Sequence, residues 1–146
     1  DKLVDIKEVK PARNQVLITE PLENLPFEGA FHMEEGYLYF RNVHKRVLIG
    51  GGRHRHRGED GSSDMQPTPE VQEFLEKLLR EVIIPGHEFT VAHRWAGILG
   101  IGPKKTPLVK QLSERTYAGI RLGGMGVALG TALGKKLADL VLEAEA

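Results

Sequence analysis

The C-terminal stretch RTYAGIRLGGMGVALGTALGKKLADLVLEAEA (115–146) constrains the fold of this chain most strongly. Its pattern is that of a β-strand, a glycine-rich turn and an amphipathic helix that begins directly after the turn. Such a turn leaves backbone N–H groups free at a helix N-terminus, where the helix dipole favours an anion or an electron-rich ring. The stretch is therefore the first place to look for a ligand.

Within this helix Gly126, Gly130 and Gly134 recur every four residues, so they share one face. Each interior glycine costs roughly 1 kcal/mol of helix stability relative to alanine. A close approach of another backbone, or of a flat ligand, would explain that cost. The spacing alone favours neither ligand binding nor simple packing.

Composition excludes several classes of function. The chain has 146 residues, enough for one domain or for a piece of a larger protein, and 20 basic residues balance 20 acidic ones. This zero net charge argues against nucleic acid as a partner. Cysteine is absent, which excludes disulfides, thiolate metal sites and a cysteine nucleophile, and suits a cytoplasmic protein.

The sequence also bears on membrane association and completeness. No run reaches about 18 consecutive apolar residues, so no transmembrane segment is expected. The chain begins in charged residues, without a methionine or a signal peptide, as a fragment of a longer protein would.

The first half of the chain predicts an antiparallel sheet. Strands are expected at 13–22, 30–33 and 37–43, followed by the run RVLIGGGR (46–53), with short turns between them. Alternation along the third strand places Tyr37, Tyr39 and Arg41 on one face and Leu38 and Phe40 on the other. The polar face is either an ordinary solvent-facing side or the wall of a binding site.

The segment TPEVQEFLEKLLREVIIPG (68–86) predicts one helix that covers the sheet. Thr68 is a suitable N-cap, Pro69 fits the first helical position, and Pro85-Gly86 ends the helix. Apolar residues recur at helical spacing from Val71 to Ile83. We assign this helix no chemistry.

The polar loop RHRHRGEDGSSDMQP (53–67) precedes that helix. His54 and His56 could hold a metal, but two histidines without a third ligand are a weak signal. The three arginines of RHRHR could bind phosphate, but Glu59, Asp60 and Asp64 follow at once and cancel their charge. A solvated loop is the favoured interpretation, and no metal site is assigned.

Four blocks of sequence carry a family resemblance. They are PARNQVLIT (11–19), GYLYFRNVHKRVLIGGGR (36–53), HRWAGILG (93–100) and GGMGVALGTALGKKLADLV (123–141). In order and spacing they resemble the C-terminal half of the FAD-dependent oxidoreductases of the D-amino-acid oxidase, glycine oxidase and sarcosine oxidase superfamily. The resemblance extends from about Pro11 to Leu142, and the last block is its most specific part.

The resemblance implies an α+β fold. A mainly antiparallel sheet of the substrate-domain type, with one covering helix, would occupy residues 1–112. A strand and a glycine-rich helix of the FAD-binding domain would occupy residues 113–146. In the family, backbone N–H groups of the glycine turn face the pyrimidine edge of the flavin and stabilise the negative charge that reduction places there. The matching cofactor-binding residues here are Gly123, Gly124, Met125, Gly126 and Val127.

The implied activity is oxidation of the C–N bond of an amine or amino acid, by hydride transfer to FAD with an imine as product. Two departures from the family pattern qualify this. The strand–GxGxxG–helix fingerprint that binds the ADP half of FAD has no match in this sequence. The resemblance therefore implies that this chain works together with an N-terminal Rossmann half that it does not contain. The fragment alone should then be inactive and should not retain FAD.

The second departure concerns substrate recognition. Glycine oxidase-like members place an arginine after the WAG segment to bind the substrate carboxylate, and the matching position here is Leu99. The carboxylate must then meet another arginine, or the substrate is not a simple amino acid. The resemblance places the active-site tyrosine near Tyr37 and Tyr39 without deciding between them. The substrate-binding candidates are Tyr37, Tyr39, Arg41, Arg53, Arg94 and Trp95, and none is assigned a catalytic step.

Two other classes of function remain open. The chain could be a non-catalytic binding module that uses the loop 53–57 and the glycine-rich surface. It could also be a structural domain whose glycine stripe packs against a partner, in which case the fragment could self-associate.

Overall fold

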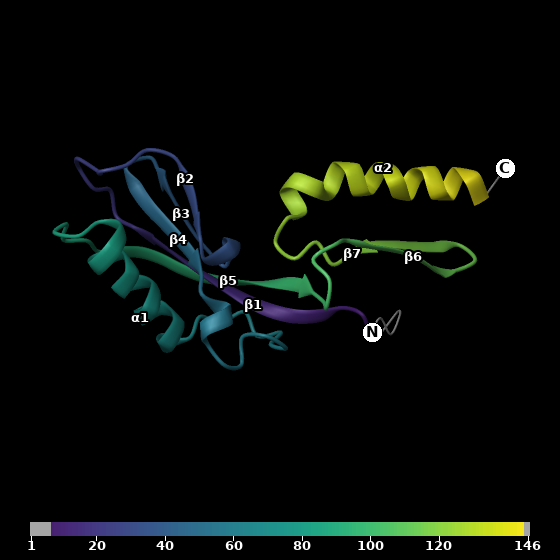
Figure 1. Ribbon diagram of the computed structural model, residues 1–146, viewed down its shortest axis with the longest axis horizontal. Helices are drawn as coiled ribbons and strands as arrows, with labels where there is room; N and C mark the ends of the chain where they lie inside the picture. The colour runs from purple at the N-terminus through teal and green to yellow at the C-terminus, as the bar shows by residue number, and fades with distance from the viewer. Residues whose placement is uncertain (1–6, 145–146) are drawn as a thin grey trace. The chain divides into compact units, whose positions relative to one another are not determined.

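The computed structural model describes residues 7–144, which form two compact units (Figure 1). Of the described residues, 13–98 form one unit, and 7–12 together with 99–144 form the other. Two strands, β1 (Lys10–Thr19) and β5 (Val91–Ile101), each contribute residues to both units. The units are described separately below.

An antiparallel sheet organises the first unit. Its strand order is β2-β3-β4-β1-β5, with β2 at Ala30–Met33, β3 at Leu38–Val43 and β4 at Arg46–Gly51. The pairs β2–β3, β3–β4 and β4–β1 are all antiparallel, which confirms the predicted antiparallel sheet. Strands β2, β3 and β4 are neighbours in sequence order, whereas β1 lies beside β4. The short turn at His44 and Lys45, both with positive φ, allows β3 to pair directly with β4.

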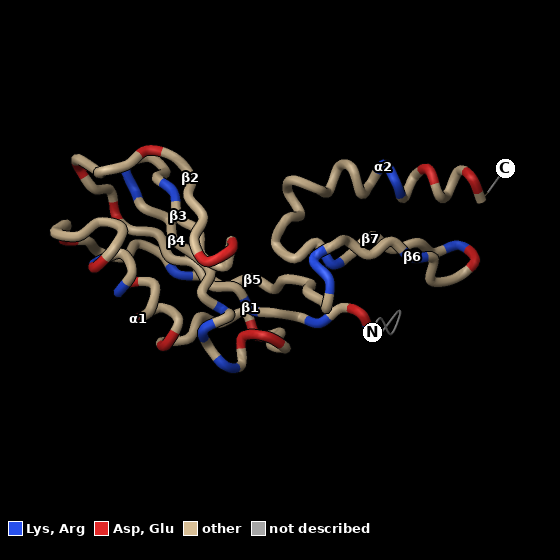
Figure 2. The backbone as a smooth tube through the Cα atoms, viewed as in Figure 1, with Lys and Arg blue, Asp and Glu red and all other residues tan. Residues whose placement is uncertain are grey.

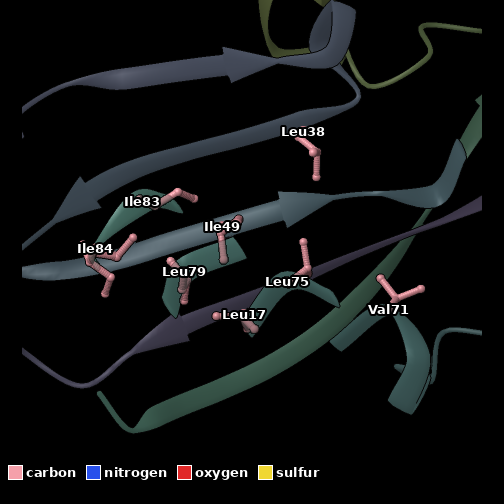
Figure 3. Packing of buried hydrophobic residues seen from close by; sticks show 9 residues of the cluster. Leu17, Leu38, Ile49, Val71, Leu75, Leu79, Ile83 and Ile84 are labelled. Atoms are coloured by element: carbon pink, nitrogen blue, oxygen red, sulfur yellow. The ribbon is translucent and has the colours of Figure 1, made fainter. Parts of the chain in front are cut away.

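A single helix covers one face of this sheet, as the apolar spacing predicts. The helix α1 (Pro69–Leu78) continues into a π-helical turn, η3 (Leu79–Ile83). Their apolar side chains pack against alternate residues of β1, β3 and β4 (Figure 3). The buried cluster consists of Leu17, Leu38, Val47, Ile49, Val71, Leu75, Leu79, Ile83 and Ile84.

The start of α1 differs in one respect from the sequence expectation. Thr68 occupies the N-cap position, but its side chain makes no capping hydrogen bond. Its hydroxyl instead accepts a bond of 2.8 Å from Gln15 Nε2, and its backbone N–H donates to Gln15 Oε1 at 2.9 Å. A buried amide on β1 therefore anchors the helix start from outside, which no local sequence pattern could indicate.

A buried ion pair anchors the loop between β4 and α1. Glu59, almost fully buried, accepts bonds from the Arg13 guanidinium at 2.7 to 3.2 Å and from Gln15 Nε2 at 2.9 Å. The backbone N–H of Arg13 also donates to the carbonyl of Glu59 at 2.8 Å. The loop is therefore pinned to β1 at its centre and is not merely a solvated connection.

The second unit consists of a hairpin and a long helix. Strands β6 (Leu108–Ser113) and β7 (Thr116–Ile120) pair antiparallel, and α2 spans Gly126–Ala144. The helix lies close to β7 at Gly119, where an added Cβ would come within 2.7 Å of Leu137 and 2.9 Å of Leu133. A glycine in β7 thus permits this tight contact.

Two negative observations apply to residues 7–144. No helix there is long and apolar enough to cross a membrane. Within the same range, no three histidine, aspartate or glutamate side chains gather closely enough to hold a metal ion.

Substitution of Glu59 by glutamine should destabilise the protein strongly, because it removes the buried counter-charge of the Arg13 guanidinium and leaves only the exposed carboxylate of Asp64, at 3.5 Å. Breaking a buried pair in this way typically costs about 3 kcal/mol. Urea unfolding monitored by circular dichroism measures the change.

The matched control is Glu23→Gln, which removes an exposed ion pair with Lys45 and should change stability by less than about 1 kcal/mol. Equal effects of the two substitutions would contradict the anchoring role of Glu59.

Candidate functional site

The glycine turn before α2 has an unusual backbone. Arg121, Gly123 and Gly124 have φ values of 63°, 56° and 94°, so three of four successive residues lie in the left-handed region. The N–H of Met125 donates to the carbonyl of Leu122 at 2.8 Å, which closes a turn with positive φ at both central residues. The N–H of Gly123 donates to the carbonyl of Gly100 at 3.1 Å and ties the turn to the end of β5.

Several amide groups at the start of α2 have no acceptor within residues 7–144. Met125 precedes the helix and accepts the first helical bond, from the Leu129 N–H at 2.9 Å. Among the described residues, no acceptor is found for the N–H groups of Gly124, Gly126, Val127 and Ala128. Of the five predicted cofactor-binding positions, Gly123 and Met125 therefore use their N–H groups within the chain, whereas Gly124, Gly126 and Val127 keep theirs available.

The surroundings of the turn are open enough for a ligand to approach. The Val127 side chain is fully exposed and Met125 is exposed, and an added Cβ at Gly123 would meet no atom within 4 Å. A Cβ added at Gly130 or Gly134 would also meet no atom within 4 Å in the described part of the chain, apart from the helix's own backbone. Packing inside this part of the chain therefore does not explain these two glycines.

On the sheet, Tyr39 is held in a defined cradle. It lies on β3 opposite Gly50 of β4, on the face away from the buried cluster. An added Cβ at Gly50 would come within 2.5 Å of the Tyr39 hydroxyl oxygen, so only glycine leaves room for the ring. Asn14 Nδ2 donates to that oxygen at 3.1 Å. Asn14 and Gly50 were not predicted as site residues, because only the strand register places them beside Tyr39.

The environment of Tyr39 keeps its hydroxyl protonated. Burial disfavours the phenolate and raises the pKa of Tyr39, and the bond from Asn14 offsets this only in part. Because Asn14 donates to the phenol oxygen, the Tyr39 proton is free to be donated elsewhere.

Arg41 differs from the other candidate arginines. It lies on β3 two residues after Tyr39 and on the same face, and its side chain is exposed. No hydrogen bond or ion pair of Arg41 is found among residues 7–144. Its guanidinium is available for an anionic ligand.

Arg53 and Tyr37 lie together at the end of the sheet where β3 begins and β4 ends. Tyr37 precedes β3 and has a helical backbone, so the alternation predicted from residue 37 begins only at Leu38. The guanidinium carbon of Arg53 lies 5.0 Å from the centre of the Tyr37 ring, and Arg53 also pairs with Asp60. Tyr37 is thus in contact with the loop, and its ring lies tilted against that of His54, with 4.5 Å between the ring centres.

The two candidates on β5 have different environments. Arg94 donates to Gln72 at 2.9 Å and also pairs with Glu76, both of which belong to α1. Its guanidinium therefore already has partners. Trp95 is exposed on β5, which is an edge strand of the sheet.

The arginine- and histidine-rich loop is not a free cationic surface. Glu34 accepts bonds from Arg55 and, at 2.6 Å, from His54, and the Arg55 bond holds the pKa of Glu34 below its usual value. Arg53 pairs with Asp60. Figure 2 shows basic residues followed directly by acidic ones along this segment. These pairs disfavour a binding module that grips phosphate through the loop.

Comparison with known proteins identifies the family of this chain. The model of the family described as FAD dependent oxidoreductase matches residues 1–140. The chain belongs to this family. A comparison with curated protein sequences finds no match.

Solved structures show the same fold. L-proline dehydrogenase from P. horikoshii matches with a TM-score of 0.74 and 18% identity, over 97% of this chain and 38% of that protein. Iminodiacetate oxidase from Chelativorans sp. BNC1 matches with a TM-score of 0.74 and 18% identity, over 93% of this chain and 37% of the oxidase. Glycine oxidase from Bacillus cereus ATCC 14579 matches with a TM-score of 0.74 and 17% identity, over 93% of this chain and 37% of that enzyme. The chain thus spans less than two-fifths of the length of these relatives.

For this FAD dependent oxidoreductase chain, we expect stability to fall at alkaline pH through Tyr39. The unfolded-state pKa of tyrosine is about 10, and the folded-state pKa is higher. The contribution is therefore complete below about pH 10 and is lost as pH rises through the folded-state pKa. Urea unfolding at stepped alkaline pH should show a smaller loss in Tyr39→Phe than in the wild type. Identical alkaline slopes for the two proteins would contradict a half-buried Tyr39 whose hydroxyl stays protonated.

Proposed function

We propose that this chain forms the flavin-closing turn and the substrate-binding sheet of an enzyme that oxidises the C–N bond of an amine or amino acid. The observation that carries the proposal is the group of unsatisfied amides at the start of α2, in a chain of a FAD-dependent family. Residues 1–112 would contribute the substrate side and residues 113–146 the flavin side. The ADP-binding half would lie elsewhere in a longer polypeptide, without which this chain should not retain FAD.

The residues at the turn fit the pyrimidine edge of a flavin. The N–H groups of Gly124, Gly126 and Val127 are donors without acceptors, next to exposed side chains and open space. FAD, when bound, would supply the acceptor for the hydride removed from the carbon beside the amine. The turn's own contribution would be to hold the negative charge of the reduced cofactor with fixed amides and the positive end of the helix dipole.

The substrate side of the proposal rests on the three arginines that sequence analysis left open. Arg53 is engaged by Asp60 and Tyr37, and Arg94 by Gln72 and Glu76. Arg41 has no partner among the described residues, and Tyr39, on the same face, has a proton to donate. We therefore assign recognition of a carboxylate to Arg41, with Tyr39 as the second donor.

The named relatives support this substrate class. They act, by name, on L-proline, iminodiacetate and glycine, each of which carries an amine nitrogen and a carboxylate. The lack of cysteine suits the reducing cytoplasm, where we place the enzyme.

Anaerobic spectroscopy of the longer polypeptide that contains this chain tests the proposed function. The purified protein should be yellow with FAD, and a small panel of amino acids and secondary amines should include a compound that bleaches the flavin absorption. A full-length protein that stays colourless after incubation with FAD would contradict the proposal.

The same measurement tests the assignment of Arg41. In Arg41→Ala the concentration of a carboxylate-bearing substrate needed for half-maximal bleaching should rise about tenfold to a hundredfold, because a charge-assisted pair is lost. The corresponding amino-acid amide should be unaffected. The control, Arg115→Ala, removes an exposed arginine of the β6–β7 turn and should change neither value.

A further inference from the structure

Arg121, which directly precedes the glycine turn, is a buried cation with an unusual set of partners. It is only 9% exposed, close to the 7% of Arg13. Arg13 is neutralised by the carboxylate of Glu59, whereas the hydrogen bonds of Arg121 go to backbone carbonyls, at 3.0 Å to Thr106 and 3.5 Å to Glu8. The side chain thus links the end of β7 to the loop between β5 and β6 and to the segment that enters β1.

The backbone of Arg121 is in an unfavourable conformation for an arginine. Its φ of 63° lies in the left-handed region, where glycine is favoured and an L side chain is strained. Such conformations persist when surrounding contacts over-determine them, and they concentrate at functional sites. Here the chain carries arginine where glycine would suit the backbone better, so the strain must be offset by the side-chain bonds.

Neighbouring glycines accommodate the arginine. At Gly102 an added Cβ would come within 2.5 Å of Arg121 Cδ and within 2.5 Å of the Glu8 carbonyl oxygen. At Gly100 the carbonyl accepts the N–H of Gly123, while the Cα lies beside the Arg121 backbone. Gly102 admits the side chain, and Gly100 fixes the turn that follows it.

We propose that Arg121 is a positioning residue for the flavin-facing turn. Its side-chain bonds hold residue 121 in the left-handed conformation, and this conformation sets the direction in which the chain enters the turn. The amides of Gly124, Gly126 and Val127 are thereby kept free and aimed in one direction. This inference rests on the proposed function, since it concerns how the same turn meets the cofactor.

Two substitutions in the longer, FAD-containing polypeptide separate the backbone from the side chain. Arg121→Gly permits positive φ but removes the side-chain bonds, and Arg121→Lys keeps the charge and most of the stem but loses the guanidinium fork. We expect Arg121→Gly to raise the Kd for FAD by about tenfold, because charge-stabilising hydrogen bonds are misaligned. The flavin midpoint potential should become more negative, since reduced flavin loses donors to its negative charge. Arg121→Lys should give smaller changes in the same direction.

The control is Arg115→Gly, an exposed position on the adjoining hairpin, which should leave the Kd and the potential unchanged. Thermal unfolding of each variant is measured in parallel. An Arg121→Gly protein that unfolds at lower temperature but keeps the wild-type Kd and potential has lost only a structural contact, and this result would overturn the proposal. If the wild-type polypeptide binds no FAD, the proposed function itself fails, and the two failures are thus distinguishable.

Discussion

Burial of the apolar stripe of α1 against one face of the sheet determines where the other side chains of residues 13–98 point. Leu17, Leu38 and Ile49 belong to three adjacent strands and are almost fully buried in that contact. Because side chains alternate along a strand, residues an odd number of positions from these leucines and isoleucine on the same strand must lie on the opposite face. Tyr39 and Arg41 are such residues, and their availability for a ligand is a direct consequence of how the helix packs.

A second constraint acts at the C-terminal turn, where the sign of the backbone angle φ, and not the burial of apolar side chains, decides the structure. Arg121, Gly123 and Gly124 all have positive φ, and the turn closes at Met125, directly before α2 begins at Gly126. The N–H groups of Gly123 and Met125 bind acceptors within the chain, whereas those of Gly124, Gly126 and Val127 have no acceptor among the described residues. Exposed donors of this kind at a helix N-terminus are suited to negative charge, which is the basis of the proposed contact with the flavin.

Much of the fold could be predicted from the sequence because the patterns that determine it are local. The antiparallel strands and the covering helix follow from alternation, turn residues and helical spacing, and the structure confirms them. The Gln15 bonds to Thr68, the Glu59 ion pair and the cradle of Tyr39 could not be predicted. Their hydrogen bonds join residues at least 25 positions apart in sequence, and the strand register brings them together.

In the candidate site, too, the region could be predicted from the sequence, but the roles of individual residues could not. The family resemblance, and not the glycine spacing alone, indicated a ligand-binding turn. The hydrogen bonds then separate Gly123 and Met125 from Gly124, Gly126 and Val127, whose amides have no acceptor among the described residues. Three arginines were equivalent in the sequence, and their partners distinguish Arg41 from Arg53 and Arg94. Arg121 carried no signal, because a non-glycine residue with positive φ cannot be recognised from its identity.

Amide hydrogen exchange in the longer polypeptide, compared with and without FAD, tests the central claim most directly. If the turn closes the flavin site, FAD should slow exchange at Gly124, Gly126 and Val127 much more than in the β6–β7 hairpin. Equal exchange at the turn in the two states, in a protein shown to hold FAD, would contradict the account.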